Sequence, residues 1–304
     1  MNQLALLIVC FVMGLLLKKI DKFPSNTPQT LNAFIINICL PAMVFRYLPK
    51  VHWNASIVYP VLVSWIVFGA GWIFFRVIGK QFSLSHNTIG CLILTAALGN
   101  TSFVGFPMIE AFYGREGLPI GMLVDQVGTF LVVSTIGILT AVKYSSGSMS
   151  ILEVVKRVAF FPSTIAMMIL FAMSRFHWDQ PEGFNFVVER LSDILTPLAL
   201  VSVGFQLGFG SLTRYLGSLT LGLTYKLFLA PGLLSLLYVY LLRTHGLTTQ
   251  VSIFEAAMPP MITGGILAIE HNLEPDLAAL MLGIGIPLSF VTLPFWAHLL
   301  ERIA

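Results

Sequence analysis

The chain has 304 residues, of which 57% are hydrophobic and only 10% carry a charge. Soluble domains contain roughly 25% charged residues, so this composition excludes a soluble protein and indicates one that is surrounded by lipid. The net charge of +3 is small and dispersed, which excludes a basic surface for nucleic acid.

The apolar residues fall into ten segments of about the length, roughly 20 residues, that a helix needs to cross a bilayer. The first segment has no basic stretch before it, so we interpret it as a retained span and not a signal peptide. Basic residues gather after the first and fifth segments, which predicts that both termini lie on the outer side of the membrane. In chain order the predicted spans are residues 2–18, 28–48, 54–76, 85–112, 118–142, 157–175, 184–208, 215–242, 248–270 and 275–300.

The spacing of proline residues suggests an internal repeat. Asn37 and Pro41 in the second span match Asp193 and Pro197 in the seventh, at an offset of 156 residues for each pair. The fourth and ninth spans carry Pro107 and Pro259, offset by 152 residues. We predict two halves of five spans, 1–145 and 150–304, joined by the polar stretch 144–150. Because five is odd, the second half is inverted relative to the first, as in many secondary transporters.

The fourth and ninth spans are broken by helix-disrupting residues. The fourth contains Gly99, Gly105 and Pro107, and the ninth contains Pro259 and Pro260. Proline removes a backbone donor, and the freed groups cannot face lipid. A single proline in a membrane helix is often a plain kink. Two breaks at matching positions, with polar neighbours, instead predict a binding site near the middle of the membrane.

Each break creates a helix N-terminus whose free N–H groups suit a carboxylate. Asn100, Thr101 and Ser102 add neutral donors and acceptors beside the first break. The predicted substrate-binding residues are Asn37, Asn100, Thr101, Ser102, Gly105, Pro107, Pro259 and Pro260.

Four ionisable residues fall inside predicted spans, where a charge is costly and is a functional hypothesis by default. They are Asp125, Asp193, Lys226 and Glu255. Asp125 and Thr129 share a helix face, and their oxygens could hold Na⁺ or a proton. Two structural alternatives remain open: an ion pair of Lys226 with one of the acids, and a capping role for Asp193 beside Pro197.

Several of these motifs resemble those of the auxin efflux carrier (PIN-like) family, in its compact bacterial form. The matching residues are Asn37, Leu40, Pro41 and Phe45 in the second span, the stretch 99–107, and the proline-containing ninth span. The resemblance covers the whole chain. It implies a scaffold of spans 1, 2, 6 and 7 that often dimerises, and a transport domain of the other six. It also implies that spans four and nine cross at their breaks, where a small organic anion such as indole-3-acetate, malate or malonate binds.

The same fold occurs in bile-acid/sodium symporters, and that similarity implies a cation site beside the crossing. The residues that it assigns to this site are Asp125, Gln126, Thr129, Glu255 and Met258. This chain departs from those symporters at Pro259 and Pro260, where they carry amides.

The sequence therefore predicts an all-α membrane protein with ten spans that works as a secondary transporter of a small organic anion. Its only expected cofactor is a coupling Na⁺ or H⁺. Its expected partners are the bilayer of a bacterial inner membrane and a second copy of the chain. Two other classes remain open: a ligand sensor with a transporter-like core, and an intramembrane enzyme that uses Asp125 and Asp193 as an acid pair.

Overall fold

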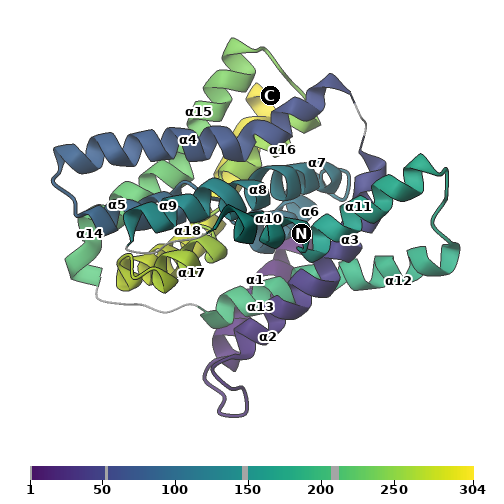
Figure 1. Ribbon diagram of the computed structural model, residues 1–304, viewed down its shortest axis with the longest axis horizontal. Helices are drawn as coiled ribbons and strands as arrows, with labels where there is room; N and C mark the ends of the chain where they lie inside the picture. The colour runs from purple at the N-terminus through teal and green to yellow at the C-terminus, as the bar shows by residue number, and fades with distance from the viewer. Residues whose placement is uncertain (1, 52–53, 146–149, 207–211) are drawn as a thin grey trace.

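The computed structural model describes residues 2–51, 54–145, 150–206 and 212–304, and the described residues are almost entirely helical (Figure 1). Within them, the only β-type backbone pairing is one isolated bridge between Gly99 and Pro260. Residues 146–149 of the predicted link between the two halves lie outside the described residues, as do 207 and 208 of the predicted seventh span.

Nine α-helices form the described part of the first half of the chain, and six short 3-10 or π-helical segments continue or connect them. The α-helices are α1 (Asn2–Leu17), α2 (Thr27–Phe34), α3 (Leu40–Tyr47), α4 (Val58–Gln81), α5 (His86–Ala96), α6 (Phe106–Tyr113), α7 (Leu118–Leu123), α8 (Phe130–Val132) and α9 (Ile138–Tyr144). The connecting segments include η1 (Ile35–Cys39), η2 (Leu48–Lys50), η3 (Ala55–Ile57), η4 (Thr101–Gly105), η5 (Val124–Thr129) and η6 (Val133–Gly137).

The second half repeats this pattern of long helices interrupted by π-helical turns. Its α-helices are α10 (Ile151–Ala159), α11 (Pro162–Arg175), α12 (Glu182–Asp193), α13 (Leu195–Gln206), α14 (Leu212–Thr224), α15 (Ala230–Ser235), α16 (Leu247–Ala256), α17 (Ile262–Glu270) and α18 (Pro275–Ile303). The π-helical segments are η7 (Tyr225–Leu229) and η8 (Leu236–Leu241).

In the described part of the chain, five continuous helical runs are long and apolar enough to cross a membrane, and a sixth does so if a bent pair counts as one span. The five runs are Thr27–Lys50, Ala55–Gln81, Leu118–Tyr144, Arg214–Leu241 and Pro275–Ile303. Helices also occupy the other predicted ranges, but these helices are shorter or broken. The described chain is therefore that of a multi-pass helical membrane protein.

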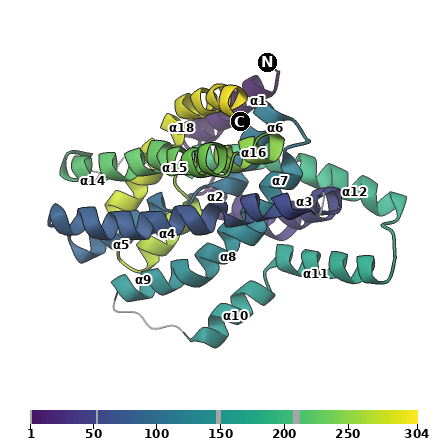
Figure 2. The same cartoon turned by 90° about the horizontal axis from the view of Figure 1, so that it is seen from above.

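The sixth predicted range is not a single straight helix. An amphipathic helix, α10, begins at Ile151 after a capping box formed by Ser150 and Glu153, and α11 leaves it at an angle of 63°. The break falls just before Pro162, because the residue that precedes a proline is pushed out of the helical region. Figure 2 shows this bent pair along one edge of the molecule.

The seventh predicted range is also interrupted, and this corrects the expectation that Asp193 is a deep acid. Helix α12 ends at Asp193 and α13 begins at Leu195. Pro197 has no N–H to donate to the carbonyl of Asp193, so the helix cannot continue regularly through this point. The Asp193 side chain is 34% exposed and lies among ion pairs.

Helix α1 packs along α13 through two glycines. A Cβ on Gly14 would lie 2.2 Å from the carbonyl oxygen of Val201, and one on Gly204 would lie 2.2 Å from that of Phe11. Small residues let membrane helices approach this closely, and the gain is van der Waals packing over the whole contact. Figure 1 shows α2 beside this pair.

Candidate functional site

The two predicted breaks meet in the structure. Gly99 pairs with Pro260 in an antiparallel bridge, and the N–H of Asn100 donates to the carbonyl of Pro259 at 2.9 Å. We call these two unwound segments, residues 97–100 and 257–261, the crossover. Because Pro259 and Pro260 have no N–H, the second segment supplies acceptors here and not donors.

The helix of the fourth span restarts at Asn100 and not at Pro107. The Asn100 side chain caps it, with Oδ1 accepting from the N–H of Phe103 at 3.1 Å. Segment η4 then runs directly into α6, so Pro107 lies inside a continuous helix. This helix therefore begins at residues 100–101, six to seven residues before Pro107, near which the sequence predicted its N-terminus. Asn100 is 3% exposed and its Nδ2 has no partner.

Asp125 is buried and receives three side-chain hydrogen bonds. Its Oδ1 accepts from the Thr101 and Ser102 hydroxyls, each at 2.5 Å, and its Oδ2 accepts from Nε2 of Gln126 at 2.7 Å. The two hydroxyls that the sequence assigned to substrate thus donate to a carboxylate of the protein itself. The Gln126 Oε1, which points away from this bond, is buried without a partner.

The Glu255 carboxyl group is also buried, but its hydrogen bonding differs from that of Asp125. It is 1% exposed, and neither carboxyl oxygen has a hydrogen-bond partner among the residues that the structure describes. A Cβ on Gly105 would come within 2.9 Å of both oxygens, and one on Gly121 would lie 3.2 Å from one of them. The two glycines therefore make the space that this carboxyl group occupies. Met258, assigned to the same site, is fully buried one turn further along.

Lys226 is a buried cation that reaches the crossover. Its Nζ donates to the carbonyl of Ala256 at 2.9 Å, and a Cβ on Gly99 would lie 2.9 Å from Nζ. The ammonium thus lies where α5 and α16 both end, and helix C-termini favour a cation. Among the described residues Lys226 forms no salt bridge. Sequence reasoning noticed this lysine but did not place it at the crossover.

Two predicted residues are not brought to this cluster. Asn37 is exposed, and its amide donates to the carbonyl of Ala33 on the same helix at 2.8 Å. The Thr129 hydroxyl pairs with that of Ser64 in α4 at 2.6 Å, whereas Asp125, on the same π-helical segment, faces Thr101 and Ser102. Thr129 therefore ties the fifth span to α4.

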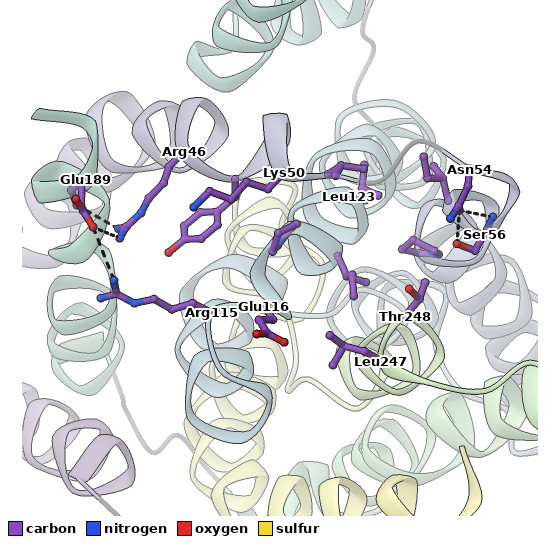
Figure 3. A pocket seen from close by; sticks show the side chains of 16 residues that line it. Arg46, Lys50, Asn54, Ser56, Arg115, Glu116, Leu123, Glu189, Leu247 and Thr248 are labelled. Atoms are coloured by element: carbon purple, nitrogen blue, oxygen red, sulfur yellow. Dashed lines mark hydrogen bonds and ion pairs between the residues drawn. The ribbon is translucent and has the colours of Figure 1, made fainter. Parts of the chain in front are cut away.

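Two cavities lie among the helices around the crossover. Cavity A has a volume of about 650 Å³ and is lined by residues from 46–51, 54–60, 115–123 and 247–248, with Glu189 (Figure 3). Cavity B has a volume of about 170 Å³ and is lined by Ser102, Asp125 and Gln126, with Arg157 and Glu270 also on its wall. Two helical runs, Thr27–Lys50 and Leu118–Tyr144, contribute to the walls of both cavities. In the ninth predicted range, Thr248 in α16 lines cavity A and Met261 in the crossover lines cavity B.

A network of ion pairs borders cavity A. Arg46 in α3 binds Glu189 at 2.8 Å and Asp193 at 2.7 Å, both on α12. Arg115, between α6 and α7, binds the same Asp193 at 3.2 Å and Glu110 at 3.2 Å. Figure 3 shows that Arg46 and Arg115 also both reach Glu189. Partial burial lowers the pKa of the Arg115 guanidinium, but Asp193 and Glu110 raise it more, so the net shift is upward. No sequence motif pointed to this network, because its members are far apart in the chain.

Broken helices that meet beside buried polar residues, in a helical multi-pass membrane protein, are typical of membrane transport proteins. The comparison with family models agrees: residues 1–297 match the membrane transport protein family, and the chain belongs to that family. The resemblance to the auxin efflux carriers is thereby confirmed at the level of the family. The family identifies the chain as a transporter and not an enzyme, so the intramembrane acid pair is not supported.

Relatives of similar length occur in archaea and bacteria. An uncharacterized transporter of Methanothermobacter thermautotrophicus is 29% identical over 299 residues, covering 96% of each chain. An uncharacterized transporter of Methanocaldococcus jannaschii is 23% identical, over 99% of this chain and 98% of the relative. The uncharacterized transporter YfdV of Escherichia coli is 22% identical, over 98% of this chain and 96% of its own.

Proposed function

We propose that this protein is a secondary transporter of a small organic anion, a mono- or dicarboxylate, that works by alternating access. The observation that carries the proposal is the crossover, with a polar cluster at its side and two separate cavities among the helices around it. Such a site, reached alternately from two sides, is the arrangement that a carrier requires.

The proposed architecture is ten spans in two inverted halves, with spans 1, 2, 6 and 7 as the scaffold and the other six as the transport domain. Helices in all ten predicted ranges and the matched breaks support it. Each cavity lies between the two groups: span 2 lines both, span 7 lines cavity A, and span 6 lines cavity B. We further propose a bacterial inner-membrane location, both termini outside, and a homodimer through the scaffold.

The proposed anion site is the crossover side of cavity B. Helix α17 begins at Ile262 without a side-chain cap, so its first N–H groups are free to bind a carboxylate. Thr263 in its first turn lines the cavity, and the unpaired Nδ2 of Asn100 supplies a further buried donor. Thr101 and Ser102 act indirectly, because they fix Asp125 and the start of the helix. Gly105, Pro107, Pro259 and Pro260 shape the backbone around the site.

Charge balance supports coupling to one monovalent cation. Asp125 and Glu255 would carry two negative charges against the single positive charge of Lys226, which leaves one excess negative charge in a buried cluster. Asp125 has three donors, which stabilise a carboxylate, whereas Glu255 has none. A buried carboxylate without donors is costly, so we propose that Glu255 takes up the coupling ion, H⁺ in preference to Na⁺. Gln126, Thr129 and Met258 would support this site.

Transport by purified protein in liposomes tests the function. Radiolabelled indole-3-acetate, malate and malonate are offered with no gradient, with a pH gradient, and with a Na⁺ gradient. We expect saturable uptake of at least one carboxylate, driven by the pH gradient.

We expect Glu255→Gln to keep exchange of the anion across the membrane but to lose the response to pH. Absence of uptake or exchange for every carboxylate tested would refute the anion assignment. A pH response that survives in both Glu255→Gln and Asp125→Asn would refute the cation site.

A further inference from the structure

The ion-pair network beside cavity A connects two parts of the molecule that the proposed function requires to move. Arg46 and the pair Glu189 and Asp193 lie on α3 and α12, which are spans two and seven of the proposed scaffold. Arg115 lies between α6 and α7, which belong to the proposed transport domain. Its guanidinium reaches across to Asp193 at 3.2 Å and to Glu189 at 3.9 Å.

The network is built asymmetrically. The Arg46 side chain is only 9% exposed and also donates to the Ser192 hydroxyl at 2.5 Å, so it holds the two acids in place on the scaffold side. The Arg115 side chain is 53% exposed and its contacts are longer. Arg46 thus binds the two acids within the scaffold. The more exposed Arg115 binds them from the other side and is able to separate from them.

We propose that Arg115 forms an ionic lock with Asp193 and Glu189 that keeps cavity A closed between the scaffold and the transport domain. When the transport domain moves, Arg115 separates from the two acids, cavity A widens, and Glu110 on α6 retains the guanidinium at 3.2 Å. The lock is made of exposed pairs, which are individually weak. It can therefore bias the conformational equilibrium without trapping the carrier in one state. This inference rests on the proposed division into scaffold and transport domain, but not on the identity of the substrate.

The test is the reactivity of a single cysteine placed in cavity A. Leu123 lines this cavity and is 3% exposed, so Leu123→Cys reports its opening. The protein is held in lipid nanodiscs, where both faces are accessible, and labelled with a polar maleimide. The native Cys10, Cys39 and Cys91 are buried, and the unsubstituted chain gives their background.

We expect Arg115→Gln to increase the labelling rate of Leu123→Cys by about two- to tenfold, as the loss of one or two exposed ion pairs allows. Arg115→Lys, which keeps the charge, should stay near the parent rate. Lys50→Gln is the matched control, since it removes a positive charge from the same cavity but Lys50 lies over the Tyr47 ring and not against Asp193.

Equal labelling rates in Arg115→Gln and the parent, with unchanged thermal unfolding, would overturn the lock. So would an equal rise in Lys50→Gln, because the effect would then follow from cavity charge alone. Liposome uptake by the same variants reports separately on the proposed function. If Arg115→Gln changes the labelling rate but no carboxylate is taken up, the lock stands and the anion assignment is refuted. If a carboxylate is taken up but the labelling rate does not change, the anion assignment stands and the lock is refuted.

Discussion

At the scale of single residues, Gly99 leaves room for the ammonium group of Lys226 because it has no side chain. A Cβ at this position would lie 2.9 Å from Nζ, which donates to the Ala256 carbonyl. We predict that Gly99→Ala displaces the ammonium and weakens a charged, buried hydrogen bond worth about 1.5–3 kcal/mol. Transport in liposomes should fall at least about tenfold. Gly69→Ala, where an added Cβ meets nothing within 4 Å, should leave transport unchanged. Normal transport by Gly99→Ala would show that the position of Lys226 is not important.

Trp296 shows how a proline on one helix is compensated by another. Pro231 has no N–H, so the Leu227 carbonyl four residues before it loses its helical donor; the Trp296 indole donates to it at 2.8 Å. We predict that Trp296→Phe leaves this buried carbonyl unpaired and destabilises the protein by about 1–3 kcal/mol. Thermal unfolding in detergent measures this. Trp178→Phe, at a side chain that is mostly exposed, should have little effect. A melting temperature equal to that of the parent would contradict the prediction.

At the scale of helices, α1 and α13 approach each other closely within the proposed scaffold. An added methyl group at Gly14 or Gly204 would meet backbone atoms at 2.2 Å, and backbone cannot move aside as a side chain can. We predict that Gly204→Ala separates the helices and lowers the melting temperature or prevents folding. Gly217→Ala, in α14 with nothing within 4 Å of its added Cβ, is the control and should be neutral or slightly stabilising. Equal stability of the two variants would mean that this contact is not needed.

Helix positions could be predicted well from the sequence, because apolar length is a strong signal and lipid imposes few other demands. The breaks could be located because glycine and proline act locally. What the sequence could not provide was the partner of each polar group. Thr101 and Ser102 were assigned to substrate, yet they donate to Asp125, which is more than 20 residues away. The ion pairs of Arg46 likewise join α3 to α12 across about 145 residues, and no local pattern encodes such a pairing.

At the scale of the whole molecule, each cavity is bordered by a contact between the proposed scaffold and the proposed transport domain, and the two contacts differ in chemistry. Cavity A is bordered by the ion pairs of Arg115. On the wall of cavity B, Phe130 at the start of α8 stacks on Phe161 at the break between α10 and α11, with ring centroids 3.9 Å apart. Because a rigid transport domain cannot open both sides at once, breaking one contact should favour closure of the other.

We therefore predict that one substitution changes the labelling rates of two single cysteines, one in each cavity, in opposite directions. Ser134 lines cavity B and is 3% exposed, so Ser134→Cys reports its opening as Leu123→Cys reports that of cavity A. Phe161→Ala removes an aromatic pair worth about 0.5–1.5 kcal/mol beyond its buried area. It should speed maleimide labelling of Ser134→Cys several-fold and slow that of Leu123→Cys. Arg115→Gln should do the reverse. If both variants instead speed labelling at both reporters, the contacts only hold the fold together, and the two cavities are not alternative openings of one carrier.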